Sequence, residues 1–210
     1  MPASSEPRRL PRQPRGRRRV DTLLDAAAAE LRDSGYEAAT MCAIANRAGS
    51  SIGSLYQFFP NKTAITQALR MRYYDEFEQM WAPLASEARR LSIEELVARM
   101  VDSTVSFVER HPAFLALLDA PASTHAPAAV RARFQQLVAG FLLARRPRMS
   151  RALALRLATV TLQTVKAMNF LYRELSPRQR RPYIQEFKML LRCYLESRIG
   201  PHGNTARRRQ

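Results

Sequence analysis

The stretch from Thr40 to Lys62, TMCAIANRAGSSIGSLYQFFPNK, restricts the possible folds of this chain more than any other. Apolar residues recur at helical spacing on both sides of Gly49, and Pro60 closes the second run. A glycine suits a tight turn between two helices, because it adopts a positive φ without steric cost. The stretch therefore predicts two short helices joined by a turn, an arrangement whose second helix can enter a groove of DNA.

The rest of the chain also follows a helical period, with no strand-like alternation and no internal repeat. One helix is predicted over about 18–34, ended by Gly35, and a long one starts at Lys62 and is expected to belong to two domains. We predict an all-α fold in four parts: a disordered basic arm over 1–16, a three-helix DNA-binding domain over 17–63, a helical domain over 64–199 and a flexible basic tail over 200–210.

Side chains that can cap a helix mark several of the predicted starts. Thr40, Ser51 and Asn61 can each accept a hydrogen bond from the backbone of the helix that follows. Ser92 and Glu95 have the spacing of a capping box. The later segments predicted as helices are 128–145, 150–174 and 176–199, and the middle one is apolar nearly all round, as expected of a helix covered on more than one side.

The charge of the chain favours a polyanionic partner. It carries 34 Lys and Arg residues against 18 Asp and Glu, a net charge of +16. Such an excess attracts nucleic acid first and an anionic membrane surface second, and charge alone does not choose between them. Almost all of the cations are arginine, which either suits phosphate and guanine or reflects a GC-rich genome. The basic arm either lies along DNA or acts as a solubilising tail.

Other classes of function leave no pattern in the sequence. Cys42 and Cys193 form no CxxC pair and no cluster with histidine, so we expect buried, reduced thiols without a disulfide or a zinc site. No apolar run reaches the roughly 18 residues of a membrane helix, and the N-terminus lacks the apolar core of a secretion signal. We find no catalytic constellation or phosphate loop, so no enzyme activity, metal or cofactor is predicted. His111 and His125 fall at helix starts or loops, where we expect surface positions.

The second helix of the motif is slim and can present side chains to base edges. Leu55 and Phe59 are four residues apart and are predicted to point back at the first helix, which leaves the other side free. Gln57 can bond bidentately to adenine, and Ile52 can touch a thymine methyl group. The hydroxyl of Tyr56 can donate to a phosphate, although the ring can also simply pack. This side of the helix is therefore the predicted contact with DNA.

Gly53 lies inside the same helix, where glycine costs about 0.5–1 kcal/mol relative to alanine. Two explanations stay open: close approach to DNA, or tight packing on the preceding helix. Thr40 and Lys62 lie at helix N-termini, where backbone N–H groups already favour phosphate. The predicted DNA-binding residues are Thr40, Ser51, Ile52, Gly53, Ser54, Tyr56, Gln57 and Lys62.

One connected pattern runs through Ala27 and Ala28, Gly35, Thr40, Ile44 and Ala45, Ala48 and Gly49, Gly53, Leu55 and Tyr56, Phe59 and Lys62. With this pattern, residues 18–66 resemble the DNA-binding domain of the TetR (tetracycline-repressor) family of bacterial regulators. The chain departs from the family at Ser50, where an apolar residue is frequent, and at Phe58, where Tyr or His is frequent. The remainder of the chain matches the family only in length and helicity.

The resemblance implies a homodimer on a palindromic operator, with 150–174 and 176–199 of both copies forming a four-helix interface. It also implies a C-terminal domain that binds a small, largely apolar effector. Asn169 and Gln163 are polar in a very apolar helix and can face a ligand or the dimer mate. The residues predicted to line the effector pocket, which can equally be ordinary core, are Met100, Phe107, Phe114, Phe134, Phe141, Met168 and Tyr172.

The expected function is a DNA-binding transcriptional regulator in the bacterial cytoplasm, associated with the nucleoid. A repressor released by its effector is the first reading, and an activator is open because the sign depends on where the operator lies. One alternative is a DNA-binding interaction or nucleoid protein without an inducer, and another is a membrane-surface binder that uses the basic tails. The expected partners are double-stranded DNA, a second copy of the chain and a small effector, with no membrane.

Overall fold

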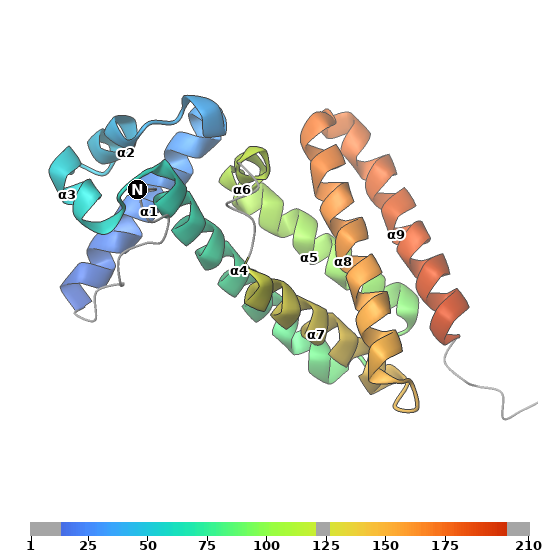
Figure 1. Cartoon of the computed structure of the whole chain (residues 1–210). Helices are drawn as coiled ribbons and strands as arrows, with labels where there is room; N and C mark the ends of the chain where they lie inside the picture. The colour runs from blue at the N-terminus through green and yellow to red at the C-terminus, as the bar shows by residue number, and fades with distance from the viewer. Residues whose placement is uncertain (1–13, 121–126, 201–210) are drawn as a thin grey trace, which may run out of the picture. The chain divides into compact units, whose positions relative to one another are not determined.

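The computed structural model describes residues 14–120 and 127–200, which form helices and short connections with no strand among them (Figure 1). The predicted all-α fold is confirmed for this part of the chain. Most of the predicted arm and tail, residues 1–13 and 201–210, lies outside it. The helices are α1 Pro14–Ala38, α2 Met41–Arg47, α3 Ile52–Phe58, α4 Lys62–Glu87, α5 Ile93–Arg110, α6 Ala113–Ala116, the 3₁₀ turn η1 Leu117–Asp119, α7 Ala128–Arg145, α8 Arg151–Glu174 and α9 Pro177–Ile199.

Helix α1 is longer than predicted at both ends. It begins at Pro14, so residues 14–16 of the predicted disordered arm are helical. Proline fits a first helical turn, where its missing N–H would have no partner, and arginines are good helix formers. Gly35 has φ 75° and ψ 176°, which interrupts the helix at the predicted end, and one more turn follows it. The correction at the start places arginines of the arm on a defined helix.

The predicted caps are confirmed. The hydroxyl of Thr40 accepts from the backbone N–H of Ala43 at 3.1 Å, and Ser51 accepts from Ser54 at 3.2 Å. Asn61 Oδ1 accepts from Ala64 at 2.8 Å. The box at the start of α5 is reciprocal: Ser92 N–H donates to the Glu95 carboxylate at 2.7 Å, and Glu95 N–H donates to the Ser92 hydroxyl at 3.0 Å. These bonds fix where α2, α3, α4 and α5 begin.

The chain divides into two compact units that differ from the predicted domain ranges. The first is Met1–Glu76 with Val108–Pro127, and the second is Phe77–Phe107 with Ala128–Gln210. Helix α4 therefore contributes residues to both units. In the first unit, α6 packs against α1, and the buried Arg70 of α4 donates from Nη2 to the carbonyl of Leu117 at 2.6 Å. These long-range contacts join residues 108–120 to α1 and α4. The domain ranges predicted from the sequence assign residues 108–120 to the second domain, 64–199.

The core of the second unit is built by α5, α7, α8 and α9. Met168 and Leu157 of α8 pack with Val97 of α5, Leu142 of α7 and Leu191 of α9 in one buried cluster. Helices α8 and α9 lie side by side, as Figure 1 shows. Helix α8 is not covered all round, because Val160 is 44% exposed. An apolar side of this helix pair is therefore left open.

Both cysteines are exposed, contrary to the expectation of buried thiols. Helical period alone does not say which side of a short apolar segment meets the core, and Cys42 falls on the outer side of α2. Among the helices of the described ranges, none combines the length and hydropathy that a membrane span requires. Within the same residues, no group of three or more His, Cys, Asp or Glu side chains could hold a metal ion.

Candidate nucleic-acid interface

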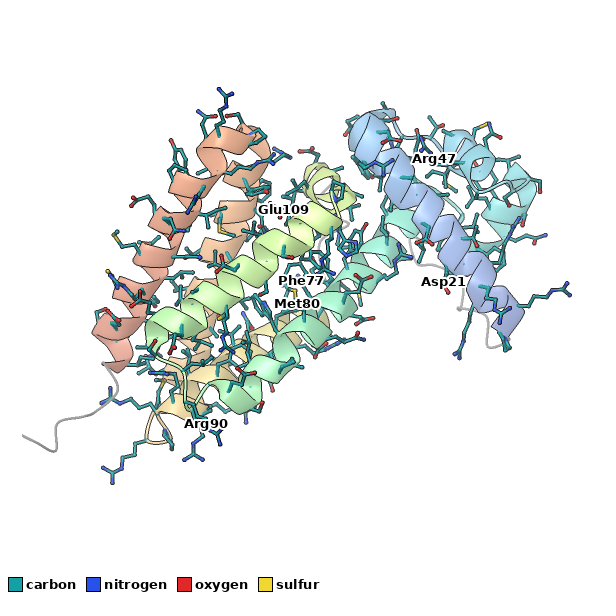
Figure 2. All side chains as sticks on the ribbon, turned by 180° about the vertical axis from the view of Figure 1, so that it is seen from behind. Asp21, Arg47, Phe77, Met80, Arg90 and Glu109 are labelled. Atoms are coloured by element: carbon teal, nitrogen blue, oxygen red, sulfur yellow. The ribbon has the colours of Figure 1, made fainter. Side chains whose placement is uncertain are left out.

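The helix-turn-helix is held in place from its inner side. Leu55 and Phe59 of the α3 region are buried, as predicted, and so is Ile44 of α2. The guanidinium of Arg47, which lies at the end of α2 and is labelled in Figure 2, pairs with Glu30 at 3.2 Å and with Asp33 at 2.9 Å, both on α1. Glu30 is buried, so this ion pair is less screened than a surface pair. The two contacts, apolar and ionic, fix the orientation of α2 and α3 on α1.

The outer side of α3 carries the predicted DNA-binding residues. Ile52 is 41% exposed and Tyr56 is 46% exposed, so two large side chains with apolar atoms meet solvent on this short helix. Ser51, Gly53 and Gln57 are exposed and Ser54 is half-buried, and Thr40 is exposed at the start of α2. The structure thus gathers six predicted residues on α3 and its cap, with donors, acceptors and apolar atoms open to a partner.

Gly53 has no packing role within the described chain. A Cβ built on Gly53 meets no atom within 4 Å, and its φ is not one that requires glycine. Tight packing on α2, one of the two explanations considered, is therefore wrong. The other explanation, close approach of a partner to the α3 backbone, is compatible with this open space. By contrast, Gly49 has φ 56° and makes the turn between α2 and α3, as predicted.

Lys62 has a structural role that the sequence did not reveal. Its ammonium donates to the carbonyls of Tyr36 and Glu37 at 2.8 and 3.0 Å, and lies 4.7 Å from the centre of the Tyr36 ring. These carbonyls belong to the last turn of α1, where a cation also favours the helix dipole. An ammonium has three donors, so one is left for a phosphate. Reduced DNA binding by a Lys62 variant would by itself not separate this brace from a phosphate contact.

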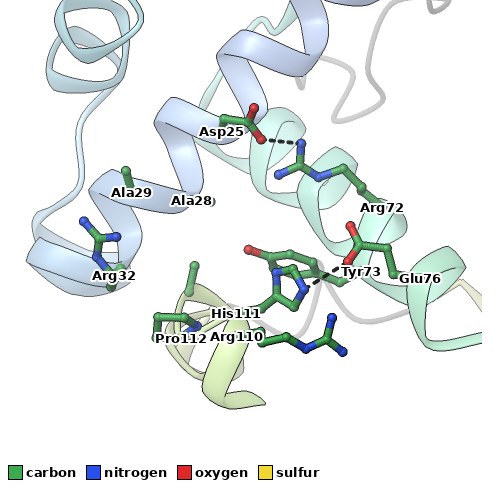
Figure 3. A pocket seen from close by; sticks show the side chains of 11 residues that line it. Asp25, Ala28, Ala29, Arg32, Arg72, Tyr73, Glu76, Arg110, His111 and Pro112 are labelled. Carbon is green, nitrogen blue, oxygen red and sulfur yellow. Dashed lines mark hydrogen bonds and ion pairs between the residues drawn. The ribbon is translucent and has the colours of Figure 1, made fainter. Parts of the chain in front are cut away.

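A polar cavity of about 330 Å³ lies in the first unit between α1, α4 and the start of α6 (Figure 3). Arg72 pairs with Asp25 at 2.7 Å on one side, and His111 Nε2 lies 3.1 Å from the Glu76 carboxylate on the other. The Tyr73 ring packs against His111 with 5.1 Å between centroids, and burial raises the pKa of Tyr73 to about 12. His111 is therefore a half-buried residue that lines this open pocket beside Glu76, rather than a simple surface residue.

His111 gives the stability of this unit a pH dependence. Burial lowers its pKa below the ordinary 6.5, and Arg110 and Arg72 lower it further, against the opposing effect of Glu76. Below pH 6.5 the unfolded chain therefore binds the proton more readily, and stability falls as the pH drops from 6.5 towards the folded pKa. We expect His111→Gln to lose less stability than the parent between pH 7.5 and 5.5 in urea unfolding. Equal losses would contradict this assignment.

The structure does not bring the predicted effector-lining residues together. Phe114 lies in the first unit, 6.2 Å from Tyr73 between ring centroids. Met168 belongs to the main core of the second unit, and Tyr172 stacks with Arg180 of α9, 4.3 Å from ring centre to guanidinium carbon. Met100 and Phe141 are buried. Phe107 and Phe134 join one aromatic group.

That group is centred on Trp81 and Phe77 of α4, which the sequence reading missed (Figure 2 labels Phe77). Phe77 lies 4.0 Å from Phe107, and Trp81 lies 5.9 Å from Phe77 and 6.2 Å from Phe134, measured between ring centroids. Trp81 Nε1 donates to Ser103 Oγ at 3.1 Å. The signal was available, since this is the single tryptophan of the chain and lies four residues after Phe77. This aromatic cluster of Phe77, Trp81, Phe107 and Phe134 is wholly inside the second unit.

Two family models match the chain. Residues 23–69 match the model described as bacterial regulatory proteins, tetR family, and residues 92–195 match that of a tetracyclin repressor-like C-terminal domain. The first range contains α2 and α3 and the second contains most of the second unit. No curated protein sequence matches the chain.

Solved structures with the same fold include several regulators. A TetR-family transcriptional regulator from Streptomyces coelicolor is 28% identical, with a TM-score of 0.67 over 86% of this chain and 99% of that one. SmeT, the repressor of the Stenotrophomonas maltophilia multidrug efflux pump SmeDEF, is 20% identical, with a TM-score of 0.62 over 88% and 91%. FadR from Bacillus subtilis, solved with stearoyl-CoA, is 15% identical, with a TM-score of 0.55 over 86% and 98%. SmeT has also been solved with triclosan.

Proposed function

Because the chain belongs to the TetR family of bacterial transcriptional regulators, we propose that it is a repressor that binds a palindromic operator as a homodimer and is released by a small, largely apolar effector. The observation that carries the DNA-binding part is Gly53, which faces open space on the exposed side of α3. An alanine at position 53 would stabilise this helix, so the presence of glycine indicates that a DNA backbone or base edge approaches there. Gln57 and Ile52 then reach base edges, and Thr40, Tyr56 and Lys62 contact phosphates.

Gly53→Ala separates folding from binding because the two effects have opposite signs. The methyl group meets no atom of the described chain, so the unfolding free energy rises by about 0.5–1 kcal/mol. Against DNA, the same methyl overpacks the interface, which costs about 1–3 kcal/mol, or roughly 5–150-fold in operator affinity. The operator is first selected from genomic fragments with the parent protein. The parent and the Gly53→Ala protein are then each titrated with this operator. A Gly53→Ala protein that is more stable and binds as tightly as its parent would remove the main support for the α3 interface.

The proposed dimer uses the open side of α8 and α9. Tyr183 and Leu190 of α9 are 45% and 56% exposed and lie seven residues apart, on one side of the helix. Val160 of α8 is 44% exposed, and Ala167 follows it one heptad later, also exposed. Exposed apolar stripes on two adjacent helices are typical of surfaces that associate. Half-sites one helical turn apart are separated by about 34–36 Å, which is the spacing that the two recognition helices of the proposed dimer have to match.

The aromatic cluster supports an effector site in the second unit. Ring faces bind apolar ligands, and the fold is shared with SmeT, solved with triclosan, and FadR, solved with stearoyl-CoA. Two polar residues of α8 offer hydrogen bonds: Asn169 is buried, and the buried hydroxyl of Thr161 has no hydrogen-bond partner among the described residues. Gln163, the other polar candidate on this helix, is exposed. The proposed ligand is therefore apolar with at least one hydrogen-bonding group.

Trp81 provides a direct probe of this site. We expect triclosan or stearoyl-CoA to change its emission in a saturable way and to weaken operator binding over the same concentration range. Phe134→Ala is expected to raise the ligand Kd about tenfold, through loss of an aromatic contact worth roughly 1.5 kcal/mol. Met189→Ala, at an exposed position, is the control. If no apolar ligand changes both emission and operator affinity, the alternative of a DNA-binding protein without an inducer is favoured.

Helix α4 is the proposed link between effector and operator. It starts at Lys62, beside the motif, and carries Phe77 and Trp81 of the aromatic cluster further along the same helix. A ligand that prefers one position of this helix shifts the population of binding-competent dimers. A coupling of about 1–3 kcal/mol would change operator affinity roughly 5–150-fold.

A further inference from the structure

The first turns of α1 carry an unusual group of arginines. Arg15, Arg17 and Arg18 are exposed, and none of the three has an acidic partner within residues 14–120 and 127–200. No acidic residue lies in the first turn of this helix. Cations at a helix N-terminus oppose the helix dipole, and like charges three residues apart repel each other. In contrast, α5 begins with Glu94 and Glu95.

A hydrogen bond ties this group to the recognition helix. Arg19 donates from Nη2 to the hydroxyl of Ser50 at 2.5 Å, and Ser50 directly precedes Ser51, the N-cap of α3. Ser50 is also where the chain departs from the resemblance to its family, which frequently has an apolar residue there. The departure is thus explained by a contact of this chain, which holds the start of α1 beside the start of α3.

Helical geometry decides which arginines share that side. Arg15 lies four residues before Arg19 and therefore on the same side of α1, whereas Arg17 lies two residues from Arg19 and points away from that side. Arg18 is three residues after Arg15 and flanks it. Large exposed apolar side chains, which would insert into a lipid surface, are found on α3, α8 and α9 but not among the described residues of this end of α1.

We infer that Arg15 and Arg18 contact the phosphate backbone of duplex DNA next to the half-site read by α3, and that Ser50 positions them through Arg19. This inference rests on the proposed function, since it adds contacts to the same operator complex. Arginine suits the role because its planar fork donates bidentately to a phosphate. The phosphates would also neutralise the unfavourable charge at the start of α1.

The test is the salt dependence of binding to the selected operator by the full-length protein. Each lost phosphate contact flattens the slope of log K against log salt by about 0.9. Arg15→Gln/Arg18→Gln removes two contacts from each subunit of the proposed dimer, so it should flatten the slope by about 3.6. Base preference should stay unchanged, since backbone contacts carry no sequence information. The matched control is Arg17→Gln/Arg90→Gln, which removes the same charge from one exposed position off the Arg19 side of α1 and one exposed position in the second unit, and should change the slope by much less.

Ser50→Val tests the positioning role. Alone it should weaken operator binding and flatten the slope, whereas in the Arg15→Gln/Arg18→Gln protein it should have little further effect, because the arginines it positions are gone. The inference would be overturned if Arg15→Gln/Arg18→Gln and the control Arg17→Gln/Arg90→Gln had equal salt slopes, or if the effect of Ser50→Val simply added to that of the first double variant. Either result would leave the proposed palindromic operator unaffected. A parent protein that selects no palindrome would instead overturn the proposed function. Arginine-dependent binding to phosphatidylglycerol vesicles with an unchanged DNA slope would assign these residues to a membrane surface and also overturn the inference.

Discussion

Replacing Leu190 by glutamate should convert the protein from a dimer to a folded monomer and lower its operator affinity by about 10²–10⁴-fold. The side chain is 56% exposed in one copy, so the charge is tolerated by the isolated fold. In the proposed dimer the same carboxylate would be moved from water onto the apolar side of α8 and α9 of the partner, which is strongly unfavourable. A monomer loses the linked binding of two half-sites, which accounts for the expected loss.

The matched control is Gln185→Glu on the same helix. Gln185 lies five residues before Leu190 on the side of α9 that lines a groove with Glu94 and Val97 of α5, away from the proposed interface. It adds the same charge and should leave both mass and operator affinity unchanged. Sedimentation equilibrium and circular dichroism give the mass and the helical content. A Leu190→Glu protein that stays dimeric would show that the second copy binds elsewhere.

Local patterns predicted the helix-turn-helix well because its determinants lie within a few residues of each other. The caps at Thr40, Ser51 and Asn61 are short-range hydrogen bonds, and the turn at Gly49 needs only a positive φ. The inward direction of Leu55 follows from helical period within one short segment. The helices after residue 128 were predicted almost to the residue for the same reason, since α7 is observed at Ala128–Arg145.

Tertiary neighbours could not be read in this way. Phe107 and Phe114 are both apolar and seven residues apart, yet they belong to different units, because the chain returns to α1 after Val108. Lys62 reaches the carbonyl of Tyr36, 26 residues earlier, and no local pattern signals such a bond. Arg19 and Ser50 meet across 31 residues, so the role of Ser50 became visible only in the structure. Each of these misses concerns which helix packs on which, a property of the folded core and not of a sequence window.

Replacing Ile52 by glutamate should lower operator affinity by about 10²–10³-fold without destabilising the protein. Ile52 is 41% exposed at the first position of α3, where a carboxylate is favoured by the helix dipole, so the melting temperature should not fall. In the proposed complex this position faces a thymine methyl group between two phosphate backbones. A negative charge placed there costs several kcal/mol, because like charges are brought together in a partly desolvated interface.

Ile52→Gln separates charge from shape in this experiment. Glutamine has nearly the size of glutamate and loses the same apolar contact, so it should cost only a few-fold in affinity, about 1 kcal/mol. The difference between the two variants is electrostatic and should shrink as salt is raised, because screening shortens the reach of the phosphate charges. If glutamate and glutamine bound the operator equally at low salt, Ile52 would lie outside the interface, and α3 would have to meet DNA through another side or not at all.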